Sequence, residues 1–114
     1  MDSRPRQGAL LRIFIGESDR HAGKPLHRWL VEAAHAHGLA GATVLRGLEG
    51  FGAGGRVHRA SILRLSEDLP LVVEIVDAEE RIRSFLPRLD GVLRQGLVTV
   101  ERVEILRAPA PDDA

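Results

Sequence analysis

The chain has 114 residues, of which 44% are hydrophobic and 28% are charged, and its sixteen basic side chains are balanced by sixteen acidic ones. This length and composition are typical of a single soluble globular domain, and zero net charge gives no reason to expect nucleic acid or an anionic membrane as the partner. The lack of cysteine excludes disulfides, thiolate catalysis and Cys-based zinc sites.

Neither end of the sequence resembles a targeting or membrane segment. MDSRPRQG has no apolar h-region, and no apolar run approaches the roughly 20 residues that span a bilayer. We therefore expect a cytoplasmic protein without direct membrane insertion. We expect residues 1–8 and 108–114 to be disordered and residues 9–107 to form one domain.

The first half of the chain predicts a strand, a helix and a second strand. Residues 10–16 (LLRIFIG) place apolar side chains on one face at period two. Residues 23–38 (GKPLHRWLVEAAHAHG) have apolar side chains at helical spacing, with a proline suited to the first turn and a final glycine suited to the position after the last turn. The second strand is expected at 42–50 (ATVLRGLEG).

The second half repeats this order. Residues 69–76 (LPLVVEIV) predict the strongest strand of the chain, and Asp77 and Glu80 are spaced like a capping box that opens a helix. Pro87 interrupts the apolar stripe of that helix and is expected to kink or restart it. Residues 97–106 (LVTVERVEIL) predict the last strand.

Two βαβ units in one short domain predict an α+β fold, the ferredoxin-like βαββαβ sandwich, in which two helices cover one face of a four-stranded antiparallel sheet. The other face is then bare, and apolar side chains on it need a cover. A homo-oligomer is the simplest cover. The residues expected on the bare face are Arg12, Phe14, Arg46, Leu48, Val72, Glu74 and Arg102.

The long connection at 50–68 begins with a glycine-rich stretch, GFGAGGRVHRAS. Gly50, Gly52 and Gly55 have the G-x-G-x-x-G spacing of a dinucleotide-binding turn. However, no capped helix follows them, and the chain is too short for a doubly wound sheet with a substrate region. We therefore reject a Rossmann site.

Long connections within compact domains are usually functional or disordered, and glycine amides next to arginines form an anion-binding surface. The connection is therefore predicted to be a ligand-binding or partner-binding loop, with a solvated hinge as the alternative. The candidate residues of this switch loop are Arg46, Gly50, Gly52, Gly54, Gly55, Arg56, His58 and Arg59.

The turn after the first strand is a second candidate anion site. It carries Glu17, Asp19, His21 and Lys24 and leads into a helix N-terminus, whose amides attract anions. The same four side chains could instead be the acid–base set of a small enzyme, and ordinary turn chemistry explains them equally well. We expect this turn and the central loop to start from opposite ends of the sheet.

Other functional classes find little support. His35 and His37 lie two apart, which points them to different helix faces, so no metal site is expected. An aromatic content of 4% without tyrosine argues against the base-stacking surface of an RNA-recognition domain. No G-x-S-x-G elbow, Ser-His-Asp order or acylphosphatase-type G-x-V-Q-G loop is present, so no catalytic motif is identified and we do not expect an enzyme.

Three strings of residues make the sequence resemble the uncharacterised PII-like family known as domain of unknown function family 190. They are G-E-x-D-x-x-x-G-K-P-L at 16–26, R-G-x-x-G-F-G at 46–52 and L-S-x-D-L-P at 65–70. The resemblance covers residues 9–107.

This resemblance implies the fold of the PII nitrogen-signalling proteins, a trimer, and an adenine nucleotide between subunits, with no cofactor required. It also implies a mobile loop, at the place of residues 50–68, that acts on a target protein such as a membrane transporter or an enzyme. Two features depart from PII proteins. The chain has no tyrosine to modify, and the segment after the second helix keeps Gly91, Arg94 and Gly96 but no lysine. A purely structural oligomeric module remains the third alternative.

Overall fold

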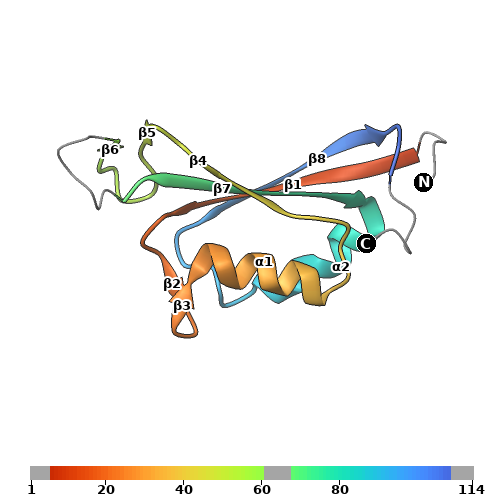
Figure 1. Cartoon of the computed structure of the whole chain (residues 1–114), viewed down its shortest axis with the longest axis horizontal. Helices are drawn as coiled ribbons and strands as arrows, with labels where there is room; N and C mark the ends of the chain where they lie inside the picture. The colour runs from red at the N-terminus through yellow and green to blue at the C-terminus, as the bar shows by residue number, and fades with distance from the viewer. Residues whose placement is uncertain (1–5, 61–67, 109–114) are drawn as a thin grey trace.

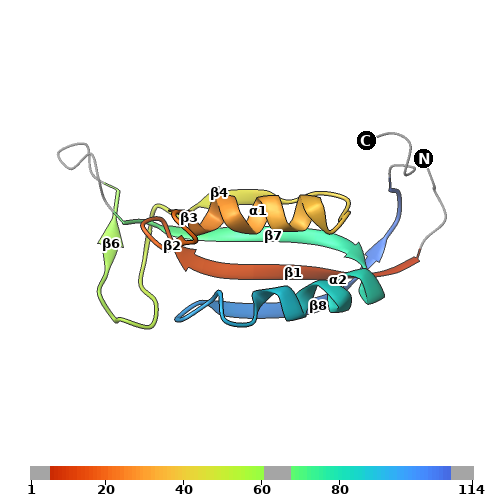
Figure 2. The same ribbon diagram turned by 90° about the horizontal axis from the view of Figure 1, so that it is seen from below.

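The computed structural model of the chain describes residues 6–60 and 68–108. Its main sheet is antiparallel with the order β4-β7-β1-β8, and α1 and α2 cover one face of it (Figure 1). Figure 2 shows α1 under the β4–β7 half of the sheet and α2 under the β1–β8 half. The predicted ferredoxin-like sandwich is thus confirmed. The elements are β1 (Arg6–Gly16), α1 (Leu26–Ala36), β4 (Thr43–Arg46), β7 (Pro70–Ala78), α2 (Glu79–Phe85), the 3-10 helix η1 (Leu86–Leu89) and β8 (Leu97–Ile105).

Two short hairpins complete the fold. Strand β2 (Arg20–His21) pairs with β3 (Lys24–Pro25), and β5 (Glu49–Gly50) pairs with β6 (His58–Arg59). The strand predicted at 42–50 is therefore two separate strands, and the long connection begins with a hairpin.

The ends of the domain differ from the sequence-based expectation. Strand β1 begins at Arg6, so residues 6–8 belong to the sheet although we expected them to be disordered. Residues 1–5, 61–67 and 109–114 lie outside the described residues, and with them most of the two expected disordered ends.

The hydrophobic core lies between the sheet and the two helices. Leu11 and Ile13 of β1 are fully buried against Leu30 of α1 and against Ile82 and Phe85 of α2. Each such side chain contributes roughly 1.5–3 kcal/mol by leaving water. The period-two pattern of β1 and the helical stripes are therefore interpreted correctly from the sequence.

Asp77 does not cap α2, so the predicted capping box is wrong. The N-cap residue is Ala78, with no side-chain cap. The Asp77 carboxylate is buried instead, and accepts hydrogen bonds from the amides of Ala40 (3.0 Å) and Ala78 (2.7 Å) and from Arg81 Nε (3.3 Å). Pro87 acts as predicted, because α2 ends at Phe85 and η1 begins at Leu86, with Pro87 in its first turn.

No helix of the described chain covers the opposite face of the sheet, which we call the open face (Figure 1). The strand pairing aligns four apolar side chains in one row across it: Leu45, Val72, Phe14 and Leu97. In the next rows Arg12 Nε lies 2.9 Å from Glu74 and Nη1 lies 2.7 Å from Glu101. The hydrogen bond to Glu74 is the main cause that raises the pKa of Arg12.

Three residues predicted for the open face are not on it. Arg46 pairs with Leu71 and Arg102 with Ala9, and both partners are buried on the helix side. Leu48 follows the end of β4. Strands β4 and β8 lack a clear polar–apolar alternation, so the sequence leaves their register open by one residue.

Candidate ligand-binding cleft

The turn after β1 and the connection after β4 lie at the same end of the sheet. Strands β1 and β4 are both antiparallel to β7, so they run in the same direction. The expectation that the two segments start from opposite ends is therefore wrong. Arg46 and Glu17 join them directly, with 3.0 Å between Arg46 Nε and Glu17 Oε2.

The glycine-rich stretch folds into the β5–β6 hairpin. Its turn is closed by a hydrogen bond of 2.9 Å from Gly55 N to the Gly52 carbonyl, and Gly55 has the positive φ of 74° that favours glycine. The hairpin is tied to the sheet by a second bond, 2.7 Å long, from Gly47 N to the Pro70 carbonyl. Glycine therefore shapes a defined hairpin here rather than a featureless linker.

A cleft of about 630 Å³ lies between this hairpin and the ends of three strands. Gly16 at the end of β1, Pro70 at the start of β7 and Leu97 at the start of β8 line its floor. Arg56 and His58 line the hairpin side. The volume falls within the range of about 300–1,000 Å³ that is usual for small-molecule sites.

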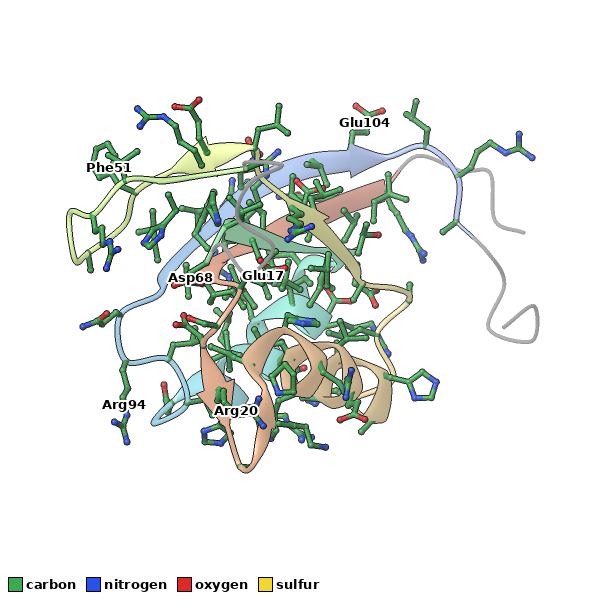
Figure 3. All side chains as sticks on the ribbon, turned by 60° about the vertical axis from the view of Figure 1, so that its left-hand side comes forward. Glu17, Arg20, Phe51, Asp68, Arg94 and Glu104 are labelled. Carbon is green, nitrogen blue, oxygen red and sulfur yellow. The ribbon has the colours of Figure 1, made fainter. Side chains whose placement is uncertain are left out.

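Two carboxylates lie side by side at the floor of the cleft. A Cβ built on Gly16 would be 3.2 Å from Asp68 Oδ1 and 3.4 Å from Asp19 Oδ1. Backbone amides hold both groups, because Gly16 N donates to Asp19 Oδ2 (3.0 Å) and Ser18 N donates to Asp68 Oδ1 (2.7 Å). Figure 3 views this end of the molecule, with Phe51 on the hairpin and Asp68 beside Glu17 at the sheet.

Most of the predicted switch-loop residues meet in the cleft, but Arg46 and Arg59 do not line it. Arg46 is paired with Glu17, and Arg59 Nε lies 3.3 Å from Glu49 Oε2 across the hairpin. The six that line the cleft are Gly50, Gly52, Gly54, Gly55, Arg56 and His58.

Of the four predicted turn residues, only Asp19 lines the cleft. His21 packs edge to face on Trp29, with 5.0 Å between ring centroids. Lys24 Nζ donates to Glu32 Oε1 at 2.7 Å, and this bond lowers the pKa of Glu32. Glu17 is paired with Arg46. The four side chains of the predicted acid–base set therefore do not meet at a common site.

Sequence reasoning missed Asp68 and Gln95 as cleft residues. Asp68 was only the last residue of the predicted connection, and nothing local indicates that β7 begins beside Gly16. The L-S-x-D-L-P string was the one signal that contained it. Arg94, in the segment after the second helix, does not line the cleft and points outward in Figure 3.

Within residues 6–60 and 68–108, no group of three or more His, Cys, Asp or Glu side chains could hold a metal ion. The expectation of no metal stays a prediction. No helix in this part of the chain is long and apolar enough to cross a membrane.

Residues 8–105 match the family DUF190, described as an uncharacterized ACR, so the chain belongs to this family. It is 42% identical over 97 residues to a UPF0166 protein of Aquifex aeolicus, which covers 85% of this chain and 91% of that protein. It is 36% identical over 92 residues to a UPF0166 protein of Methanocaldococcus jannaschii, over 80% of this chain and 84% of that protein.

The fold is similar to that of CPII, a nitrogen regulatory PII-like protein from Thiomonas intermedia, in its structure bound to ADP, AMP and bicarbonate. The TM-score is 0.70 at 17% identity, over 93% of this chain and 94% of CPII. Both the predicted family and its PII-like fold are thus confirmed.

Proposed function

We propose that this protein is a cytoplasmic PII-like regulatory protein that binds an adenine nucleotide in the cleft. The observation that carries the proposal is the cleft itself, where a glycine-rich hairpin brings Arg56 and His58 over three strand ends. The fold of CPII, which binds ADP and AMP, supports the choice of ligand.

The hairpin side of the cleft is suited to phosphate. Residues 50–58 contain Arg56 and His58 but no acidic side chain, and four glycines leave their backbone amides open to close approach. An arginine can bind phosphate oxygens with two parallel hydrogen bonds, which are stronger than bonds between neutral groups. We assign the phosphate contact to Arg56.

The cleft is completed by a second copy of the chain. Phe14 and Leu97 belong both to the cleft and to the apolar row of the open face. A neighbour that covers this face would therefore also close the cleft, and the nucleotide would lie between subunits. By analogy with the PII fold, we propose a homotrimer.

The hairpin is the element that signals. Leu48 is 80% exposed and Phe51 is 72% exposed, so both offer apolar surface to a partner. A nucleotide that contacts Arg56 would favour one hairpin position and so change the surface offered to a target protein, such as a membrane transporter or an enzyme. The protein itself is not proposed to be an enzyme, because the rival acid–base set is dispersed.

Isothermal titration with ADP, AMP and ATP tests this function. The wild-type protein is expected to bind at least one of them, and Arg56→Ala is expected to weaken that binding by about 10- to 100-fold, the usual effect of losing a hydrogen bond to a charged group.

Arg59→Ala is the matched control, because Arg59 lies on the same hairpin and pairs with Glu49 outside the cleft. Its affinity should stay within about twofold of wild type, since exposed ion pairs contribute little. The proposal is wrong if no adenine nucleotide binds, or if the two variants behave alike.

A further inference from the structure

We propose that Asp19 and Asp68 bind the hydroxyl groups of the ligand's ribose and thereby fix its orientation, with the phosphate at the hairpin. The inference rests on the proposed function, because it places a nucleotide in the same cleft. It adds the direction in which the nucleotide lies in the cleft, and it names two residues that select for a ribose.

In each carboxylate, one oxygen accepts a hydrogen bond from a backbone amide and the other accepts none from the described residues. Asp19 Oδ2 accepts a bond from Gly16 N, and Asp68 Oδ1 accepts one from Ser18 N. Among the described residues, Asp19 Oδ1 and Asp68 Oδ2 have no hydrogen-bond partner. An ionised carboxylate can only accept hydrogen bonds, so these two oxygens, which water can reach, are open to hydroxyl donors of a ligand.

The space between the two carboxylates is kept open by Gly16. Both Asp68 oxygens and Asp19 Oδ1 lie within 3.5 Å of the position that a Cβ on Gly16 would occupy. A Cβ there would make a tight contact with Asp68 Oδ1 and would occupy the space beside Asp19 Oδ1. With glycine, two acceptors from different segments of the chain face the same small volume, as two adjacent hydroxyl groups require.

The charges of the cleft exclude the opposite orientation. The two carboxylates belong to the strand ends, whereas Arg56 belongs to the hairpin side. A phosphate next to Asp19 and Asp68 would meet two like charges, while at Arg56 it meets an opposite one. The ribose of a nucleotide offers two neutral donors, and these fit the acidic end.

The Asp68→Asn variant tests which of the two orientations the nucleotide adopts. Asparagine keeps an oxygen that can accept from Ser18 N, but it turns the other carboxylate atom into a donor that cannot accept from a hydroxyl. Titrations of wild type and variant with ADP and with 2′,3′-dideoxy-ADP give four dissociation constants. We expect wild type to prefer ADP by about tenfold or more, and this ratio to fall towards one in the variant.

Asp90→Asn is the control, because Asp90 is an exposed residue outside the cleft, and it should keep the wild-type ratio. Tighter binding of ADP by Asp68→Asn would overturn the inference, since it would mean that phosphate lies beside the carboxylate. An unchanged preference for ADP in the variant would also overturn it.

The test also separates this inference from the function on which it rests. If ADP binds and requires Arg56, but wild type does not distinguish ADP from its dideoxy analogue, only the ribose assignment fails. If no adenine nucleotide binds to wild type, both fail.

Discussion

Asp77 links three segments of the fold through a single buried carboxylate. It is the only charged residue that is buried in the described part of the chain. Its oxygens accept from the amide of Ala40 after α1, from Ala78 at the start of α2 and from Arg81 within α2. Arg81 also donates to the carbonyl of Gly38. The ends of the two helices are thus joined through one side chain.

The Asp77→Ala variant should therefore be destabilised by about 3 kcal/mol, because it leaves two amides and a guanidinium without their charged acceptor. Urea unfolding followed by circular dichroism measures the loss. Asp90→Ala, which removes an exposed aspartate, should change stability by less than about 0.5 kcal/mol. Equal effects of the two substitutions would contradict this role of Asp77.

Single residues also show how far the site follows from sequence. The glycines, Arg56 and His58 were predicted because their local composition is unusual. Asp19 was predicted from its turn, but without its true neighbours. Asp68 could not be found, because its place in the cleft depends on a contact between segments 50 residues apart, as in the bond from Ser18 N. Local patterns carry no information about such contacts.

At the scale of elements, the base of the β5–β6 hairpin packs on Pro70 at the start of β7. A Cβ on Gly47 would lie 2.9 Å from Pro70 Cγ, and one on Gly50 would lie 3.2 Å from the same atom. The bond from Gly47 N to the Pro70 carbonyl lies at this same contact. The position of the hairpin over the cleft therefore depends on glycine at its base.

We expect Gly47→Ala to cost about 1–3 kcal/mol of stability through overpacking, and to weaken ADP binding severalfold by shifting the hairpin. Gly41→Ala is the control, because a Cβ on Gly41 meets no atom within 4 Å and Gly41 does not line the cleft. It should leave the stability nearly unchanged. Urea unfolding and titration with ADP check both variants, and a normal affinity in Gly47→Ala would refute the link between hairpin position and binding.

The elements themselves were largely predictable, because β1, β7 and both helices have clear apolar periods. The errors fall where that signal is weak. Strands β4 and β8 have mixed faces, so Arg46 and Arg102 were assigned to the wrong side. The short β5–β6 hairpin has no apolar pattern at all, and its pairing follows from the turn at Gly52–Gly55.

At the scale of the whole molecule, the proposed assembly rests on the open face. Its apolar row crosses all four strands of the main sheet, and Leu45 in this row is 47% exposed. The charges of Arg12, Glu74 and Glu101 pair with one another on the same face. Arg12 thus serves both carboxylates, and the cluster keeps a net charge of −1 that a covering partner must leave in water or match with a cation.

The Leu45→Glu variant should prevent assembly, because it would bury an unpaired charge between copies. In a monomer the same side chain would lie in water, so the fold of the single chain should be unaffected. Light scattering coupled to size exclusion should give wild type three times the chain mass of 12.5 kDa, and the variant a smaller mass. His35→Glu, on an exposed position of α1, is the control and should remain trimeric. A monomeric wild type would contradict the proposal that another copy of the chain covers the open face.

Gly16 and Gly96 also have a consequence for the history of the family. A side chain at Gly16 would meet the two carboxylates, and one at Gly96 would lie 3.2 Å from the Phe14 carbonyl oxygen. Gly41, by contrast, lies outside the cleft and has free space around it. Relatives that use the same cleft are therefore expected to retain glycine at the first two positions and to vary freely at the third. Aligned sequences alone could then show which lineages have kept the cleft and which have lost it.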